Sequence, residues 1–210
     1  MPERGFFITF EGGEGAGKTT QIALFAERLR AEGRAVRVVR EPGGTALGEE
    51  VRGILKHAPY GDSLDDRAEM LLFAASRAQL VAEVIRPALE AGETVICDRF
   101  ADSTLAYQGR GRGLPEDVIA VVNNFATGSL VPELTVLLDL PATEGLARAH
   151  KRAAEAHRDR METLGSAFYE RVRTAYLEMA QRDPTRFFVV DARLPAAEIA
   201  EKIWARAGKR

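Results

Sequence analysis

The 210-residue sequence predicts an α/β fold: a doubly wound, five-stranded parallel sheet with helices on both faces. First, five short apolar segments alternate with longer segments whose apolar residues recur at helical spacing. Second, strands that are separated by helices run parallel, because each crossover returns the chain to the same end of the sheet. Third, 46 % of the residues are hydrophobic and 29 % are charged, as in an ordinary globular domain with a sizeable core. We therefore expect residues 1–210 to form a single domain.

The start of the chain contains two strands with a helix between them. Residues 5–10 (GFFITF) are a continuous apolar run that ends at a glycine cluster, which predicts a buried strand. Apolar residues at positions 22, 25, 26 and 29 follow at helical spacing. A second strand is expected over residues 35–40, because Pro-Gly-Gly at 42–44 ends it. A further helix beyond that turn contains Arg52.

A long helical segment comes next. Residues 63–66 supply capping side chains and first-turn acids, and apolar residues between 80 and 89 form one stripe. The remaining elements are strands over residues 94–97, 134–140 and 186–190 and a closing helix over residues 196–207. Asp98 and Arg99 directly follow the third strand, at the sheet edge where ligands collect in open α/β folds.

The segment at residues 12–19 reads GGEGAGKT and matches the phosphate-loop pattern G-x-x-x-x-G-K-[ST] at each fixed position. Glycines let successive backbone N–H groups point at phosphate oxygens, Lys18 can neutralise the β- and γ-phosphates, and the Thr19 hydroxyl can ligate Mg²⁺. A chance glycine turn would explain the string, but not its position between a predicted strand and a predicted helix. The sequence thus predicts a phosphate-loop nucleoside triphosphatase-type fold. The expected ATP contacts here are Gly12, Gly13, Glu14, Gly15, Ala16, Gly17, Lys18, Thr19 and Thr20.

Composition and missing motifs exclude several classes of protein. The formal charge of −2 gives no reason to expect bulk binding to nucleic acid or to a membrane surface. The single Cys97 excludes an internal disulfide framework, and no apolar run reaches the length of a membrane span, so we expect a cytoplasmic protein. The guanine-reading sequence Asn-Lys-x-Asp of signalling GTPases is absent. The length suits a small kinase, which needs only this core, an acceptor site and a lid.

Five segments resemble thymidylate kinase in their order and separation, over nearly the full length of the chain. They are FEG at 10–12, REPGGT at 40–45, Phe73 with Arg77 and Gln79, DRF at 98–100, and STLAYQG at 103–109. The resemblance implies transfer of the γ-phosphate of ATP to dTMP, giving ADP and dTDP for dTTP synthesis, with Mg²⁺ as cofactor. It also implies a homodimer, formed through long helices such as the one around Leu80.

The same resemblance assigns roles at the acceptor site. Arg99 clamps the dTMP phosphate, although a structural salt bridge with a helix would also explain an arginine there. Asp98 lies near Mg²⁺, and capping of the next helix is its alternative role. Arg52 is a second phosphate contact. No general base is needed, because the acceptor is already an anion, so the site must chiefly supply cations.

Phe73 and Arg77 share one helix face because they are four residues apart. By resemblance this pair stacks on thymine and donates a hydrogen bond to its O4; otherwise Phe73 is core and Arg77 solvated. Tyr107 packs on the sugar and excludes a ribose 2′-hydroxyl, and Glu14 accepts from the 3′-hydroxyl. The complete set of expected acceptor contacts is Glu14, Glu41, Pro42, Arg52, Phe73, Arg77, Arg99, Ser103, Thr104, Tyr107 and Gln108.

The remaining catalytic cation is expected in a lid over residues 148–160. One variant of the family has an arginine in the phosphate loop where this chain has Gly15, whereas the bacterial-type variant supplies it from the lid. Arg152 and Arg158 are the candidates, alongside Lys18 and Arg99, and Arg148 is expected to stack on adenine. By composition alone the segment fits a solvated helix face equally well.

Two other functions remain open from the sequence. Another nucleotide or small-metabolite kinase would share the phosphate loop but not an acceptor pocket lined by Phe73, Arg77 and Tyr107. A nucleotide-dependent switch protein would use the lid and the GRGRG segment at 109–113 on nucleic acid, and its binding would be salt-sensitive.

Overall fold

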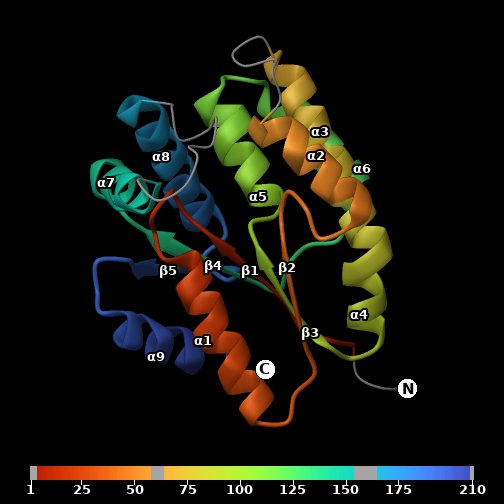
Figure 1. The fold of residues 1–210 in the computed structure, drawn as a ribbon, viewed down its shortest axis with the longest axis vertical. Coiled ribbons are helices and arrows are strands. Elements are labelled where there is room, and N and C mark those ends of the chain that lie inside the picture. The colour runs from red at the N-terminus through yellow and green to blue at the C-terminus, as the bar shows by residue number, and fades with distance from the viewer. Residues whose placement is uncertain (1–3, 58–63, 154–164, 209–210) are drawn as a thin grey trace.

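The computed structural model describes residues 4–57, 64–153 and 165–208. Its five parallel strands form one sheet in the order β2-β3-β1-β4-β5 (Figure 1). The strands are β1 (Phe7–Glu11), β2 (Val36–Arg40), β3 (Thr94–Asp98), β4 (Leu134–Asp139) and β5 (Phe187–Asp191). The predicted fold class is therefore confirmed, and every predicted strand lies within two residues of its observed bounds.

Helices cover both faces of this sheet, as expected. The α-helices are α1 (Lys18–Ala31), α2 (Ala46–His57), α3 (Asp66–Leu80), α4 (Arg86–Glu90), α5 (Ala101–Thr104), α6 (Glu116–Thr127), α7 (Ala142–Ala153), α8 (Ser166–Arg182) and α9 (Ala196–Ala207). Two π-helical segments, η2 (Val81–Ile85) and η3 (Leu105–Gly111), continue α3 and α5. None of these described helices combines the length and apolarity that a membrane crossing requires.

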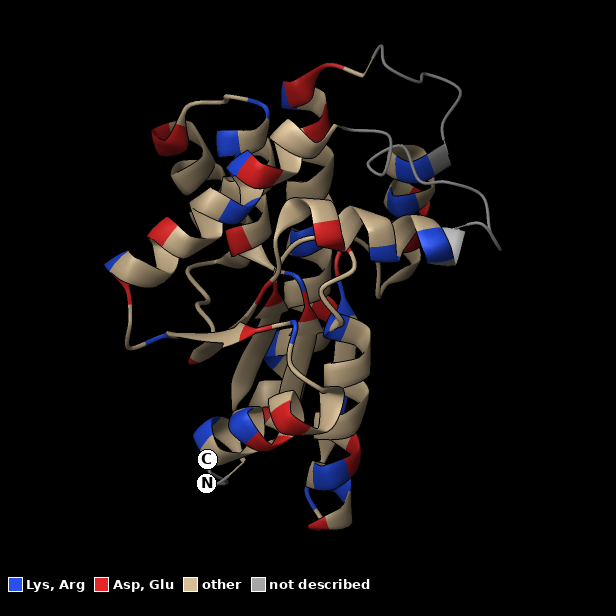
Figure 2. Ribbon diagram, turned by 90° about the vertical axis from the view of Figure 1, so that its left-hand side faces the viewer, with Lys and Arg blue, Asp and Glu red and all other residues tan. Residues whose placement is uncertain are grey.

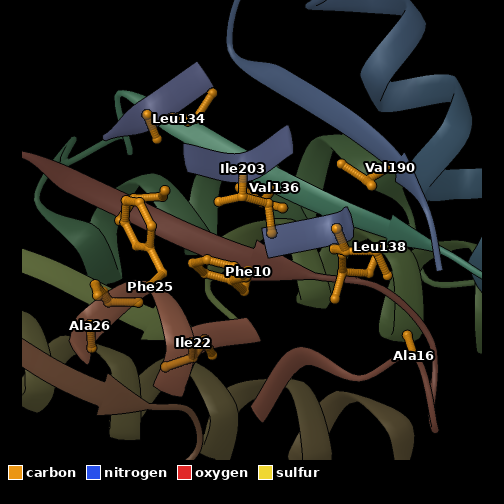
Figure 3. Packing of buried hydrophobic residues seen from close by; sticks show 14 of the residues in the cluster. Phe10, Ala16, Ile22, Phe25, Ala26, Leu134, Val136, Leu138, Val190 and Ile203 are labelled. Carbon is orange, nitrogen blue, oxygen red and sulfur yellow. The ribbon is translucent and has the colours of Figure 1, made fainter. Parts of the chain in front are cut away.

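The two faces of β1 pack into different parts of the core. Ile8 and Phe10 face α1 and α9, where Phe10, Phe25 and Ile203 meet between the sheet and the helices (Figure 3). Phe7 points to the other face and packs with residues of η2 and α4. Each fully buried side chain of this size contributes about 1.5–3 kcal/mol, so the central strand is anchored from both sides.

The long helical segment begins as predicted but is not uniform. The Asp65 side chain caps α3 by accepting a hydrogen bond of 2.9 Å from the backbone N–H of Arg67. The helix widens over η2 directly before Pro87, which lies in the first turn of α4. Proline has no N–H to donate and its ring crowds the preceding turn, so the regular α-helical pattern does not continue through this position.

The strand register brings the candidate site residues to one edge of the sheet. Asp98 at the end of β3 lies beside Phe10 of β1 and Arg40 of β2. Glu11 at the end of β1 lies beside Leu137 of β4. Because all five strands are parallel, the loops after β1, β2 and β3 leave from this same edge, which is where open α/β sheets bind ligands.

Candidate active site

The phosphate loop follows β1 and ends where α1 begins at Lys18. Two of its glycines are required by the close approach of other backbone. Gly12 has φ +135°, and a Cβ there would lie 2.4 Å from the carbonyl oxygen of Leu138. Gly15 has φ +68°, and its Cβ would lie 2.3 Å from the carbonyl oxygen of Gly145. The loop therefore curls tightly against β4 and α7 and opens onto the N-terminus of α1, an arrangement that binds phosphate.

Lys18 lies inside this curl and is buried. Its Nζ donates hydrogen bonds to the carbonyl oxygens of Gly12 (3.1 Å) and Gly13 (3.0 Å). Burial, together with the nearby charge of Arg99, lowers the pKa of the Lys18 ammonium below its usual value. An anionic phosphate in the loop would offset both effects, so the ammonium is poised for an anion.

Arg99 sits directly after β3 in the left-handed region, with φ +68°. Its Nη1 donates to the Gly12 carbonyl (3.1 Å), and its Nη2 donates to Glu14 Oε1 (2.6 Å). The guanidinium also lies over the Tyr107 ring, 4.9 Å from the centroid. The acid that pairs with Arg99 is thus Glu14 of the phosphate loop. The alternative interpretation, a structural salt bridge to a helix, does not match this contact.

Glu14 is the acid that faces these cations. Burial alone would raise the pKa of the Glu14 carboxyl, but the charges of Arg99 and Lys18 outweigh burial and hold the pKa below its usual value. Tyr107 adds a weak hydrogen bond of 3.3 Å from its hydroxyl to Glu14 Oε1. The carboxylate therefore partly neutralises these two cations, and an incoming phosphate would compete with it for Arg99.

Arg77 of α3 is almost completely buried, with 1 % of its surface exposed, so it is not a solvated helix residue. Nε and Nη2 face the Glu41 carboxylate at 2.9 and 2.7 Å, and Nη2 also donates to the Phe100 carbonyl. Nη1 donates to Asn123 Oδ1 at 2.7 Å. All three guanidinium nitrogens thus donate hydrogen bonds, and Nη1, which carries two hydrogens, has one left without a partner among the described residues.

One cavity of about 250 Å³ connects the phosphate loop with Arg77. All eleven predicted acceptor contacts line it, as do the loop residues from 14 to 20. The lining residues are Glu14, Gly15, Ala16, Gly17, Lys18, Thr19, Thr20, Arg40, Glu41, Pro42, Arg52, Leu55, Lys56, Phe73, Arg77, Asp98, Arg99, Ser103, Thr104, Tyr107 and Gln108. Two of their oxygens, Asp98 Oδ1 and Thr104 Oγ1, are buried without a hydrogen-bond partner among the described residues.

Other predicted site residues lie away from the cavity wall. The Gly12 and Gly13 carbonyls bind Lys18 behind it, and Arg148 Nη1 donates to the Ala192 carbonyl at 3.1 Å. Arg158 lies outside the described residues, and only the backbone of Arg152, in α7, is described. The predicted roles of these two arginines stay predictions.

Sequence reasoning did not single out several residues that the structure brings to the site. Arg40, Leu55 and Lys56 line the cavity. Asn123 of α6 orients Arg77, and Tyr176 of α8 binds the side chain of Glu11. Glu11 lies in the FEG segment and Arg40 in the REPGGT segment, so both could have been inferred from those segments. The sequence around Asn123 and Tyr176 does not indicate a role for either residue.

A sequence profile of the thymidylate kinase family matches residues 10–203, which include the phosphate loop and all the cavity-lining residues. The chain belongs to the thymidylate kinase family. The resemblance inferred from five short segments is thus confirmed.

Relatives in this family are similar to the chain over nearly its whole length. A thymidylate kinase of Deinococcus radiodurans is 51 % identical over 207 residues, which cover 99 % of this chain and 98 % of the relative. A thymidylate kinase of Thermomicrobium roseum is 54 % identical over 200 residues, covering 95 % and 93 %. The crystal structure of thymidylate kinase from Ehrlichia chaffeensis has a TM-score of 0.72 at 36 % identity, and the match covers 89 % of this chain and 93 % of that one.

Proposed function

We propose that this member of the thymidylate kinase family transfers the γ-phosphoryl group of ATP to dTMP, giving dTDP and ADP. The observation that carries the proposal is one cavity that is lined by the phosphate loop, by Arg99 and by the buried Arg77. The names of the relatives support the choice of acceptor. We place the reaction in the cytoplasm, where ATP is available.

Positioning and charge stabilisation account for the proposed chemistry. A dTMP phosphate is already a nucleophilic anion, so the site needs cations and alignment rather than a base. Lys18 binds the β- and γ-phosphates of ATP, and Arg99 binds the acceptor phosphate after displacing Glu14. The released carboxylate then faces the acceptor sugar, where it accepts a hydrogen bond from the 3′-hydroxyl. Tyr107, beneath Arg99, excludes a 2′-hydroxyl.

The choice of base follows from donors that the fold holds in place. The remaining Nη1 hydrogen of Arg77 donates to thymine O4, whereas cytosine presents an amino group there. The Thr104 hydroxyl, which has no hydrogen-bond partner in the described part of the chain, supplies a second polar contact for the base edge. Phe73 of α3 lines the same cavity and stacks on the thymine ring.

The residues present fit a nucleotide-bound Mg²⁺ ion. Asp98 Oδ1 is a buried carboxylate oxygen without a partner among the described residues, and Asp98 and Thr19 line the same cavity. The described residues contain no group of three or more His, Cys, Asp or Glu that would hold a metal alone. This suits Mg²⁺, which keeps most of its coordination for water and phosphate oxygens. The ion would neutralise charge that develops on the transferred phosphoryl group.

We further propose that the whole chain is one kinase domain with a lid at 148–160 whose arginines complete the site. Arg152 and Arg158 neutralise the transferring group, and Arg148 stacks on adenine. Closure of such a segment excludes water from the reaction.

A homodimer is the expected assembly, and the exposure of apolar residues supports the choice of one face for it. Leu80 is fully buried against the sheet, so it offers no surface to a partner. The outer faces of α3 and α6, which pack together, instead expose Leu71 (54 %), Val121 (71 %) and Phe125 (88 %). We propose that a second copy of the chain covers this α3–α6 face.

A coupled ADP-release assay tests the function. Purified protein with ATP and Mg²⁺ is offered dTMP, dUMP, dCMP, dGMP, UMP and AMP separately, and turnover led by dTMP is expected. Turnover led by another monophosphate would keep a kinase and refute the assignment of the base pocket. No acceptor-dependent turnover, together with salt-sensitive binding to nucleic acid, would favour the switch protein instead. Figure 2 shows acidic and basic residues interspersed along the helices, so no wholly basic face supports that alternative in this view.

A further inference from the structure

A cluster of side chains around a buried carboxyl contacts Arg99, and two of its members, Glu11 and Tyr176, have no role in the mechanism above. It consists of Glu11 at the end of β1, Phe100 and Ser103 after β3, and Tyr176 of α8; we call it the Glu11 cluster. Glu11 is fully buried. Its Oε1 accepts a hydrogen bond of 2.7 Å from the Phe100 backbone N–H. Its Oε2 lies 2.7 Å from both the Ser103 and the Tyr176 hydroxyl oxygens, which are 2.8 Å from one another.

These contacts hold the backbone on both sides of Arg99. With φ +68°, Arg99 adopts a conformation that is disfavoured for any residue with a Cβ, so its surroundings must maintain it. The Arg99 N–H donates to the Phe10 carbonyl at 3.0 Å, and the next N–H along the chain, that of Phe100, donates to Glu11. The consecutive amides of Arg99 and Phe100 are thus hydrogen-bonded to Phe10 and Glu11, which are consecutive residues of β1.

The cluster also reaches the Arg99 side chain. Ser103 Oγ, which bonds Glu11, lies 3.5 Å from Arg99 Nη1, and the same Nη1 donates to the Gly12 carbonyl. Glu11 directly precedes Gly12 in the chain, so the cluster lies next to the carbonyl that Arg99 binds. A buried carboxyl that is held by neutral hydrogen-bond donors does little to stabilise a fold, and what it positions is the better explanation for it.

We propose that Glu11 is a positioning residue for the acceptor phosphate: through Phe100, Ser103 and Tyr176 it holds Arg99 in the conformation that faces the cavity. Its kinetic consequence rests on the proposed function. Loss of the cluster displaces Arg99 but leaves the phosphate loop and Lys18, so binding of the acceptor weakens more than binding of ATP.

Three variants and a control test this inference. Tyr176→Phe removes one hydroxyl, Glu11→Gln keeps an acceptor for the Phe100 N–H, and Glu11→Ala removes the whole contact. Thr9→Val is the control, because it removes a buried hydroxyl contact (3.0 Å to Thr135 Oγ1) from the same strand without touching the cluster. We expect Tyr176→Phe to raise the KM for dTMP about tenfold, with the KM for ATP within twofold of the native value. Glu11→Gln should be milder than Glu11→Ala, and Thr9→Val should lower only the Tm.

Crystal structures of the variants test positioning without any activity. In Glu11→Ala, Arg99 is expected to leave φ near +68° and to lose its contact with the Gly12 carbonyl. If Glu11→Ala does not fold, Tyr176→Phe is used in its place. An unchanged Arg99 in each variant that folds would overturn the inference, as would equal increases in the KM values for dTMP and ATP. If the native protein fails to phosphorylate dTMP, the proposed function fails, and the crystal structures still decide whether Glu11 positions Arg99.

Discussion

At the scale of single residues, the site is a balance of buried and partly buried charges that an incoming phosphate would alter. Arg99 is bound to Glu14 at 2.6 Å, and Lys18 is bound to loop carbonyls. Neither cation is solvated as it would be at a surface, so both have lost hydration before a ligand arrives. Binding of a polyanion restores favourable charge pairing, which makes the contacts with phosphate strong.

Replacement of Arg99 tests this balance directly. Arg99→Ala removes the cation that we propose to bind and orient the acceptor phosphate, so we expect a higher KM for dTMP and a lower kcat. The loss in kcat/KM should be about 100-fold or more. Steady-state kinetics measure this loss. As the control, ATP should still raise the Tm of Arg99→Ala, which would show that the ATP site is intact. Native constants in Arg99→Ala would refute the assigned role.

Glu11 also makes stability depend on pH. Burial, and then the charge of Asp102, raise the pKa of the Glu11 carboxyl from 4.5 to about 7. Between these values the folded chain binds more protons than the unfolded chain, so the free energy of unfolding falls as the pH rises. We expect Glu11→Gln to lose less Tm than the native protein between pH 5 and pH 7, whereas Thr9→Val should keep the native slope. Parallel Tm profiles for the native protein and Glu11→Gln would contradict the assignment.

At the scale of elements, the loop after β1 depends on backbone approach as much as on side chains. A Cβ at Gly12 meets the Leu138 carbonyl at 2.4 Å and a φ of +135°, so Gly12→Ala should push the loop away from β4. We expect it to destabilise the fold by about 1–3 kcal/mol and to weaken ATP binding. Gly53→Ala is the control, since nothing lies within 4 Å of a Cβ there and alanine favours a helix by about 0.5–1 kcal/mol. Calorimetry measures the effect of each substitution on unfolding and on ATP binding. Equal effects of Gly12→Ala and Gly53→Ala would show that the close approach of Leu138 does not require a glycine at position 12.

The lid segment supplies a second prediction at this scale. Arg152→Ala and Arg158→Ala are each expected to lower kcat, by up to about 10³-fold for the arginine that contacts the transferring group. The KM for dTMP should stay within twofold, because the proposed role of both residues is at the transferring group and not at the acceptor. Lys151→Ala, a change in the adjacent residue, serves as the matched control. Unchanged kcat in both arginine variants would place the catalytic cation elsewhere.

Elements and site residues were predictable from the sequence to different degrees. Strands and the helix at Ala196–Ala207 follow from local periodicity and from glycine or proline boundaries, so their positions agree closely. The η2 segment depends on how Pro87 is accommodated within a long helix, which periodicity does not report. Partners far apart in the chain were beyond sequence reasoning, as Tyr176 and Glu11 show, which are 165 positions apart. Arg77 was recognised as a site residue, but its burial against Glu41 and Asn123 was not.

At the scale of the whole molecule, the exposed α3–α6 face is the feature that a single copy of the chain leaves unexplained. Phe125 and Val121 lie four residues apart and share one face of α6, and Leu71 is exposed on α3, which packs against α6. Side chains of this size are seldom grouped so openly on a monomer. The cavity opens toward the carboxyl edge of the sheet, and α3 also contributes Phe73 and Arg77 to it. A partner on the outer face of α3 would therefore support the helix that reads the base.

Substitution on that face tests the dimer. Light scattering of the native protein is expected to give twice the chain mass of 23.0 kDa. Phe125→Asp places a charge in the centre of the proposed interface, so we expect a monomer. Val189→Asp is the matched control, because Val189 is a half-exposed residue on β5, at the far edge of the sheet. It should remain dimeric. A monomeric native protein, or a Phe125→Asp variant that stays dimeric, would show that the second copy does not cover α3 and α6. If monomeric Phe125→Asp also has a raised KM for dTMP, dimerisation supports the base pocket through α3.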